Sequence, residues 1–145
     1  MKLESSAFLY GKPIPVRYTC DGEDISPPLL ISDVPKGCKS LALIVDDPDA
    51  PVGVFDHWIV WNLHPKTNDL AEGVSLPHEG ENGFGTTGWR GPCPPRGAPH
   101  RYFFKLYALD QMLSLGQGSN KEEIEKAMEG RILEKAELMG TYKRS

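Results

Sequence analysis

Short apolar runs separated by glycine and proline dominate the hydrophobic pattern of this chain. The clearest runs span residues 29–34, 41–46, 57–63 and 101–109, and each has the length of a β-strand. The 41–46 run is apolar at successive positions, which is typical of a central strand covered on both faces. The glycines and prolines fall between the runs. The pattern therefore predicts many short strands joined by irregular loops, and not a helical bundle.

The C-terminal quarter carries a different pattern. Ser119 or Asn120 is suited to cap a helix, a glutamate three residues further on completes a capping box, and Gly130 marks the expected end. Apolar residues recur between these points at helical spacing, namely Ile124, Ala127 and Met128. Residues 136–142 then alternate between apolar or small and polar positions, which predicts a final strand.

Residues 65–99 show little periodicity and are rich in glycine, proline, asparagine and histidine. Loops of this length are uncommon in compact domains and are often functional. Its glycine-rich segment, residues 83–91, lacks the lysine that ends a phosphate-binding loop and does not join a strand to a helix. We expect this segment to shape a pocket wall. Phe55 and Trp89 are aromatic candidates for the pocket mouth, with packing in the core as the alternative for either ring.

Length and charge narrow the class of protein. A chain of 145 residues fits one domain spanning residues 1–145. The net charge is −4, and no cluster of lysine and arginine provides the basic patch that nucleic-acid binding requires. No apolar stretch has the length of a signal-peptide core or a membrane span. We therefore expect a cytoplasmic protein with no nucleic-acid partner and no integral membrane association.

The three cysteines, Cys20, Cys38 and Cys93, are odd in number and show no C-x-x-C spacing. The simplest interpretation is three free thiols in a reducing compartment, with a Cys20–Cys38 disulfide as the alternative. Zinc sites usually bring paired ligands, so we expect no metal at these cysteines. Cys93, between two prolines, is also a candidate nucleophile, although a free packed or loop thiol is the favoured state.

The side chains that could bind a ligand or take part in catalysis lie at the ends of the predicted strands. Asp47 follows the 41–46 run and precedes a proline, and taken alone it is most simply a turn residue. His57 and His100 each begin an apolar run, and Tyr102 follows His100 by two residues. A carboxylate near an imidazole favours the charged imidazolium. Together with the Tyr102 hydroxyl, these groups predict a small site for a phosphate or carboxylate ligand.

The same groups allow other chemistry. Asp47, His57 and His100 are also a potential zinc triad, but the histidines do not form a closely spaced local pair. They also suit a hydrolase in which Asp47 orients His57 or His100 as general base, but the chain has no G-x-S-x-G motif. We therefore expect a binding protein with no catalytic residues, metal or cofactor, and keep the hydrolase as the alternative.

Two motifs give the chain a resemblance to a known family. The first is the Asp-Pro-Asp-Ala-Pro run of residues 47–51 followed by His57, and the second is Pro-Pro-Arg-Gly at residues 94–97 followed by His-Arg-Tyr at 100–102. With these motifs the chain resembles the phosphatidylethanolamine-binding protein family, in particular its compact bacterial and archaeal branch of Raf-kinase-inhibitor-like proteins. The resemblance spans nearly the whole chain.

The resemblance implies a mainly β fold. This is an antiparallel Greek-key β-sandwich, with a large central sheet flanked by a smaller one and one or two short helices near the C-terminus. It also implies an anion pocket for a phosphoryl head group, lined by Asp47, His57, His100 and Tyr102, with a rim of Pro51, Phe55, Pro94 and Pro95. The partners it implies are a small phosphorylated or carboxylated ligand, a kinase or protease regulated by protein contact, and a second copy of the chain in a homodimer.

Overall fold

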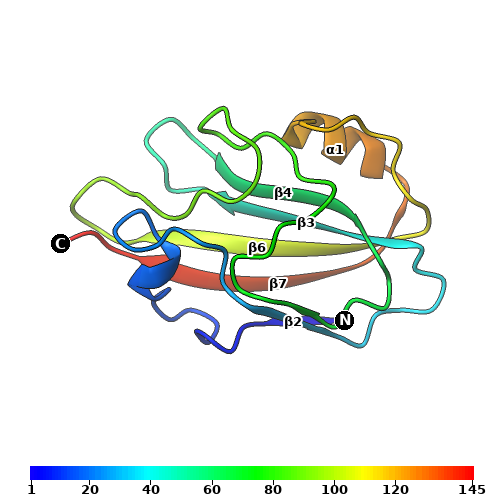
Figure 1. Ribbon diagram of the computed structural model, residues 1–145, viewed down its shortest axis with the longest axis horizontal. Coiled ribbons are helices and arrows are strands. Elements are labelled where there is room, and N and C mark those ends of the chain that lie inside the picture. The colour runs from blue at the N-terminus through cyan, green and yellow to red at the C-terminus, as the bar shows by residue number, and fades with distance from the viewer.

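Two antiparallel β-sheets pack against each other in the computed structural model, which describes all residues from 1 to 145 (Figure 1). The larger sheet has the order β4-β3-β6-β7, with bounds Phe55–Leu63, Ser40–Asp47, His100–Leu109 and Ile132–Tyr142. The smaller sheet has the order β1-β2-β5, with bounds Lys2–Glu4, Leu29–Ser32 and Asp69–Leu70. The predicted arrangement of a large antiparallel sheet flanked by a smaller one is confirmed.

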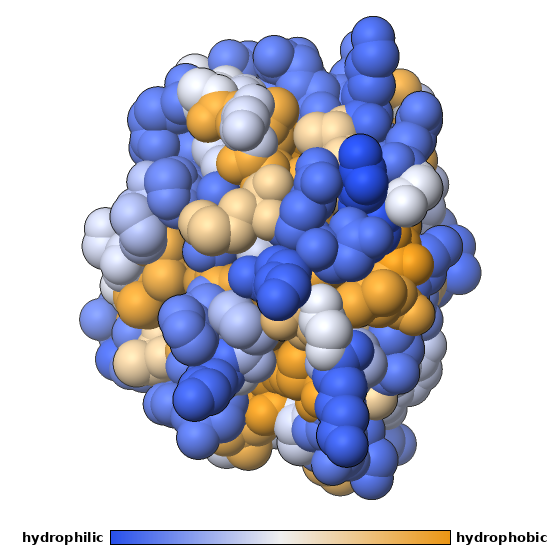
Figure 2. All heavy atoms as spheres, turned by 90° about the vertical axis from the view of Figure 1, so that its right-hand side faces the viewer, coloured by the Kyte–Doolittle hydropathy of each residue, from blue (hydrophilic) through white to orange (hydrophobic).

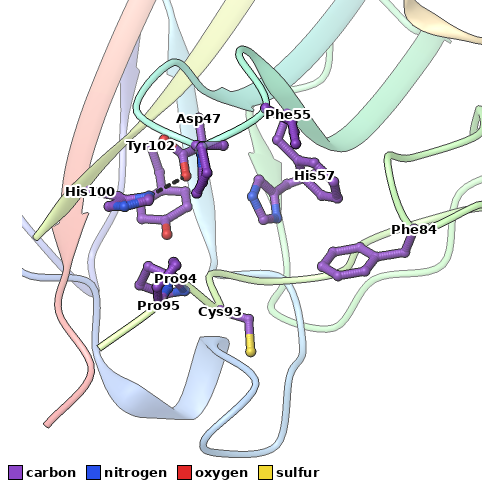
Figure 3. A pocket seen from close by; sticks show the side chains of 12 residues that line it. Asp47, Phe55, His57, Phe84, Cys93, Pro94, Pro95, His100 and Tyr102 are labelled. Atoms are coloured by element: carbon purple, nitrogen blue, oxygen red, sulfur yellow. Dashed lines mark hydrogen bonds and ion pairs between the residues drawn. The ribbon is translucent and has the colours of Figure 1, made fainter. Parts of the chain in front are cut away.

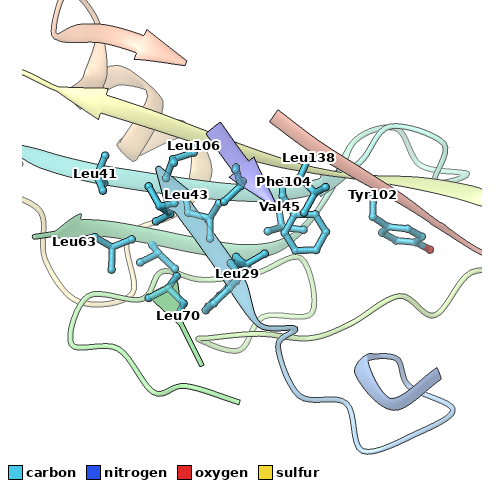
Figure 4. Close-up of a cluster of buried hydrophobic side chains, with 14 of the residues drawn as sticks. Leu29, Leu41, Leu43, Val45, Leu63, Leu70, Tyr102, Phe104, Leu106 and Leu138 are labelled. Atoms are coloured by element: carbon cyan, nitrogen blue, oxygen red, sulfur yellow. The ribbon is translucent and has the colours of Figure 1, made fainter. Parts of the chain in front are cut away.

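Strand β3 is buried along its whole length because it lies between β4 and β6 and is covered on both faces. Its alternate side chains enter two separate cores. Leu41, Leu43 and Val45 pack in the larger core with residues of the smaller sheet such as Leu29 (Figure 4). The residues between them, such as Ile44, pack in a second core on the other face. The central strand expected from the continuous apolar run is therefore confirmed.

Helix α1, Lys121–Met128, covers the second core. The Asn120 side chain accepts from the Glu123 backbone N–H at 2.9 Å, and Glu123 accepts from the Asn120 N–H at 3.2 Å, which is the predicted capping box. Ile124 and Met128 of this helix are buried in the second core. A 3₁₀ turn, η1 at Val16–Tyr18, was not predicted. No helix of the structure has the length and apolar character needed to cross a membrane.

Residues 65–99 contain only the short strand β5, as their lack of periodicity predicts. Their backbone is nevertheless fixed along the outer edge of β4. Gly80 N–H donates to the Ile59 carbonyl at 2.8 Å, and Arg90 N–H donates to the His57 carbonyl at 3.1 Å. These hydrogen bonds satisfy backbone groups at the edge of the sheet that would otherwise be unpaired. They also position the loop beside the first residues of β4.

The cysteine prediction is wrong for two of the three residues. Cys20 and Cys93 form a disulfide with their Cα atoms 5.4 Å apart, so neither is a free thiol, and the alternative Cys20–Cys38 bond is also wrong. Cys38 is free. The pairing follows from a contact between two distant loops, in which Cys20 N–H donates to the Pro92 carbonyl at 3.1 Å. A spacing of 73 residues gives no local signal of that contact.

Candidate functional site

A pocket of about 210 Å³ opens at the end of the larger sheet, where β3 ends and β4 and β6 begin (Figure 3). Because β3 is antiparallel to both neighbours, Asp47 pairs with Phe55, the first residue of β4, and Asp46 pairs with Phe103 near the start of β6. The opposite end of the molecule shows mainly hydrophilic side chains with scattered apolar ones between them (Figure 2). The pocket is lined by Asp47, Ala50, Pro51, Val52, Phe55, His57, Phe84, Cys93, Pro94, Pro95, His100 and Tyr102.

Asp47 and His100 are hydrogen-bonded to each other at one wall of the pocket. The distance from Asp47 Oδ2 to His100 Nδ1 is 2.7 Å, and the two side chains are only 5% and 13% exposed. The other carboxylate oxygen of Asp47 accepts from the Asp49 backbone N–H at 2.7 Å. The carboxylate therefore stabilises the local turn and also fixes the imidazole. His100 uses Nδ1 for this contact, and its Nε2 has no partner in the protein.

Asp49 faces away from this pair. Its carboxylate accepts from the Arg101 backbone N–H at 2.9 Å. It also accepts two hydrogen bonds from the Arg101 guanidinium, at 2.8 and 2.9 Å. Hydrogen bonds from Arg101 lower the pKa of Asp49 to about 2, so this carboxylate is ionised at neutral pH. Asp49 thus holds the turn after β3 against the start of β6.

His57 is 3% exposed and lies in an aromatic environment. Its ring centroid is 5.2 Å from that of Phe55, 6.0 Å from Phe84 and 5.3 Å from Tyr102. Nδ1 donates to the Arg90 carbonyl oxygen at 2.6 Å, and Nε2 has no partner in the protein. Burial lowers the pKa of His57, which favours the neutral ring. With the proton on Nδ1, the neutral ring presents Nε2 as an acceptor.

Tyr102 contributes a buried hydroxyl without a hydrogen-bond partner. The side chain is 1% exposed, and Figure 3 shows its hydroxyl oxygen directed toward Pro94. Burial raises the pKa of Tyr102, so the group stays protonated and can donate. Buried polar groups are nearly always hydrogen-bonded, so this hydroxyl has a donor that is unused within the chain.

The structure brings all four expected rim residues to the pocket, namely Pro51, Phe55, Pro94 and Pro95. Trp89 does not line the pocket. Its ring packs against the core, with its centroid 5.6 Å from that of Trp58 and 6.0 Å from that of Phe104. The glycine-rich segment does shape the wall, because a Cβ at Gly83 would lie 2.6 Å from the Phe55 ring. This close approach seats Phe84 over Phe55, with ring centroids 4.8 Å apart.

Four lining residues were not predicted: Ala50, Val52, Phe84 and, as a wall residue, Cys93. Ala50 and Val52 flank Pro51 in the loop after β3, so their place next to a rim residue was the available signal. Phe84 is the aromatic residue within the segment expected to form the wall. Phe84 is 41% exposed, and the Arg90 guanidinium lies over its ring with Cζ 4.6 Å from the ring centroid.

The side chains of the lining determine which contacts a bound molecule could make. No serine or threonine lines the pocket, and the sulfur of Cys93 is committed to a disulfide, so the lining holds neither an aliphatic hydroxyl nor a free thiol. No three histidine, cysteine, aspartate or glutamate side chains are placed to hold a metal ion together. What the pocket offers is two imidazoles and one hydroxyl, each with an unused hydrogen-bonding atom.

Known proteins resemble this chain closely over its whole length. A UPF0098 protein of Methanothermobacter thermautotrophicus is 52% identical over 99% of both chains, and one of Chlamydia muridarum is 53% identical over 98% of both. Among solved structures, a phosphatidylethanolamine-binding protein homolog from Chlamydia trachomatis, CT736, has a TM-score of 0.95 at 51% identity, covering 99% of this chain and 97% of that one.

Two further comparisons concern the family itself. The YbcL protein of Escherichia coli, described as a member of the mammalian PEBP family, has a TM-score of 0.92 at 30% identity, with 99% and 98% of the two chains covered. The family model described as phosphatidylethanolamine-binding protein matches residues 4–143. With a family match over nearly all of its residues and a shared fold, the chain belongs to the phosphatidylethanolamine-binding protein family.

Proposed function

We propose that the pocket binds a small anion of the phosphoryl type. The observation that carries this proposal is the orphaned Tyr102 hydroxyl in the same wall as the His100–Asp47 pair. When His100 is protonated, Asp47 balances its charge and Nε2–H becomes a donor beside the Tyr102 O–H. Charge-assisted hydrogen bonds of this kind are strong, and phosphate oxygens accept them well.

The walls support the proposal because they are stiff before any ligand arrives. Pro51, Pro94 and Pro95 restrict the backbone around the pocket, and the disulfide ties Cys93 to the segment that follows η1. A preformed site loses less conformational entropy on binding than a mobile one. The donors can therefore hold a small ligand that makes few contacts.

Histidine NMR signals test the proposal directly. We expect the ring signals of His100 to shift on addition of phosphate or phosphoethanolamine at millimolar concentration. His100→Ala should weaken binding about tenfold or more, as expected for loss of a charged hydrogen bond. His64→Ala is the matched control, because His64 is exposed and lies outside the pocket. Unchanged His100 signals, or equal affinity of the two variants in calorimetry, would contradict the proposal.

A hydrolase is the second candidate, favoured by one feature of the same site. The hydrogen bond from His100 Nδ1 to Asp47 is the contact by which a carboxylate orients a general base. A screen with ester, phosphate and peptide substrates would detect such an activity, and turnover that is lost in His100→Ala and His57→Ala would establish it. The regulation of a kinase or protease, a homodimer and a cytoplasmic location stay predictions from family resemblance and composition.

A further inference from the structure

We propose that the pocket selects an anion that carries its own acidic proton, such as a phosphate monoester in its singly charged form. The P–OH group would donate to His57 Nε2, while unprotonated oxygens accept from His100 Nε2–H and Tyr102 O–H. This inference rests on the anion binding proposed above and goes beyond it, because it separates small oxyanions by whether they carry an acidic proton.

The geometry around His57 makes it an acceptor. Its Nδ1 is committed as a donor to the Arg90 carbonyl, so the proton of the neutral ring is on that nitrogen and Nε2 carries a lone pair. Three aromatic rings surround the imidazole, and its exposed fraction is 3%. A second proton on this ring would place a charge in an apolar environment, which burial opposes.

The titratable groups that face His57 come from two neighbouring strands. Asp47 belongs to β3, and His100 and Tyr102 belong to β6. Asp47 favours a proton on His57, as do the more distant Asp24 and Asp46, but the effect of burial is larger. Asp47 is also already hydrogen-bonded to His100. The pocket therefore offers one imidazole that is hydrogen-bonded to a carboxylate and one that burial keeps neutral.

The charges of the lining residues also favour a singly charged ligand over a doubly charged one. No lysine or arginine lines the pocket, so positive charge inside it comes only from imidazole. A protonated His100 is already balanced by Asp47. A dianion would then bring two further negative charges into a partly apolar pocket, and His57 would have to be protonated to compensate them. A monoanion brings one charge and, if it carries P–OH, also supplies the donor that His57 lacks.

Common anions differ in this property. A phosphate monoester loses its second proton near pH 6, so both forms are present around neutrality. Sulfate at that pH is a dianion without a proton, and a phosphate diester is a monoanion without P–OH. Methyl phosphate, sulfate and dimethyl phosphate thus separate the effect of charge from the effect of the donated proton.

The test is calorimetry of these three anions at about pH 6, where about half of a phosphate monoester is singly charged. Wild type should bind methyl phosphate at least about tenfold more tightly than either sulfate or dimethyl phosphate. Its affinity should fall as the pH is raised and the ligand loses its proton. In His57→Phe, which replaces the ring with one suited to the aromatic surroundings, the preference should fall to about threefold or less.

The outcomes distinguish the two proposals. If wild type binds sulfate or dimethyl phosphate as tightly as methyl phosphate while His100 signals respond, the selection is wrong and anion binding stands. If His100 signals respond to none of the three anions, both proposals fail. The wild-type series gives the answer alone if His57→Phe does not fold, and a thermal melt of that variant shows whether it does.

Discussion

Asp46 and Asp47 are neighbours in β3, but their carboxylates interact on opposite faces of the sheet. Asp47 Oδ2 pairs with His100 in the pocket, whereas Asp46 Oδ2 accepts from Lys105 Nζ at 3.1 Å and from Lys121 Nζ at 2.9 Å. Asp46 is 1% exposed, and its second oxygen has no hydrogen-bond partner. The ammonium groups are therefore what compensates this buried charge, directly behind the pocket.

Lys121→Met should destabilise the fold by about 3 kcal/mol, because it leaves Asp46 with a single cationic partner. The loss extends to Asp56, whose Oδ1 lies 3.4 Å from Lys121 Nζ and whose pKa is raised by burial. Urea unfolding at neutral pH measures the change. Lys126→Met, in the same helix but exposed and unpaired, is the matched control and should change little. Equal effects of the two substitutions would contradict this account.

Asp47→Asn should weaken phosphate binding about tenfold or more while the chain still folds. The amide preserves the shape of the side chain but removes the negative charge that balances a protonated His100. Asp49→Asn removes a carboxylate from the same turn, but one that faces Arg101 and lies outside the pocket. Calorimetry should therefore give nearly wild-type affinity for Asp49→Asn, and the same loss in both variants would show that only the turn matters.

The sequence predicts the larger sheet well because its signals are local. The runs that became β3, β4 and β6 are long and apolar, and their predicted bounds differ from the observed ones by at most two residues at either end. The last strand, β7, begins at Ile132, earlier than the expected residue 136, because its first residues are exposed and show no alternation. β1 and β5 have three and two residues, too few to carry a period.

In the site, too, local sequence predicts some residues, whereas others depend on contacts between distant segments. Asp47, His57 and His100 were found because each stands at the end of a predicted strand and within a family motif. The disulfide and the position of Phe84 were missed because both depend on the path of the long loop along β4. That path is set by backbone hydrogen bonds to a strand edge, which are independent of side-chain identity.

Cys20→Ser and Cys93→Ser should each lower the free energy of unfolding by about 2–4 kcal/mol, because the disulfide closes a long loop in the unfolded chain. Cys38→Ser, at the free cysteine, should have little effect. Urea unfolding with and without a dithiol reductant gives the measurement. Reductant should destabilise wild type and Cys38→Ser but not the other two variants. A wild type that is insensitive to reductant while fully reduced would rule out this role.

The stability of the protein should fall as the pH is lowered through the range below 6.5, and His57 should be one cause. Because the folded-state pKa of His57 is lowered, the unfolded chain binds its proton first, and each fall in pH then favours unfolding until the folded-state pKa is reached. The slope from one such group is at most about 1.4 kcal/mol per pH unit. His57→Phe should remove this component, whereas His64→Gln, at an exposed histidine, should keep it. Urea unfolding at about pH 7.5 and about pH 5, in buffer without phosphate, compares the three proteins. An identical pH dependence in wild type and His57→Phe would mean that the buried ring accepts its second proton as readily as an exposed one, and the acceptor role assigned to Nε2 would fail with it.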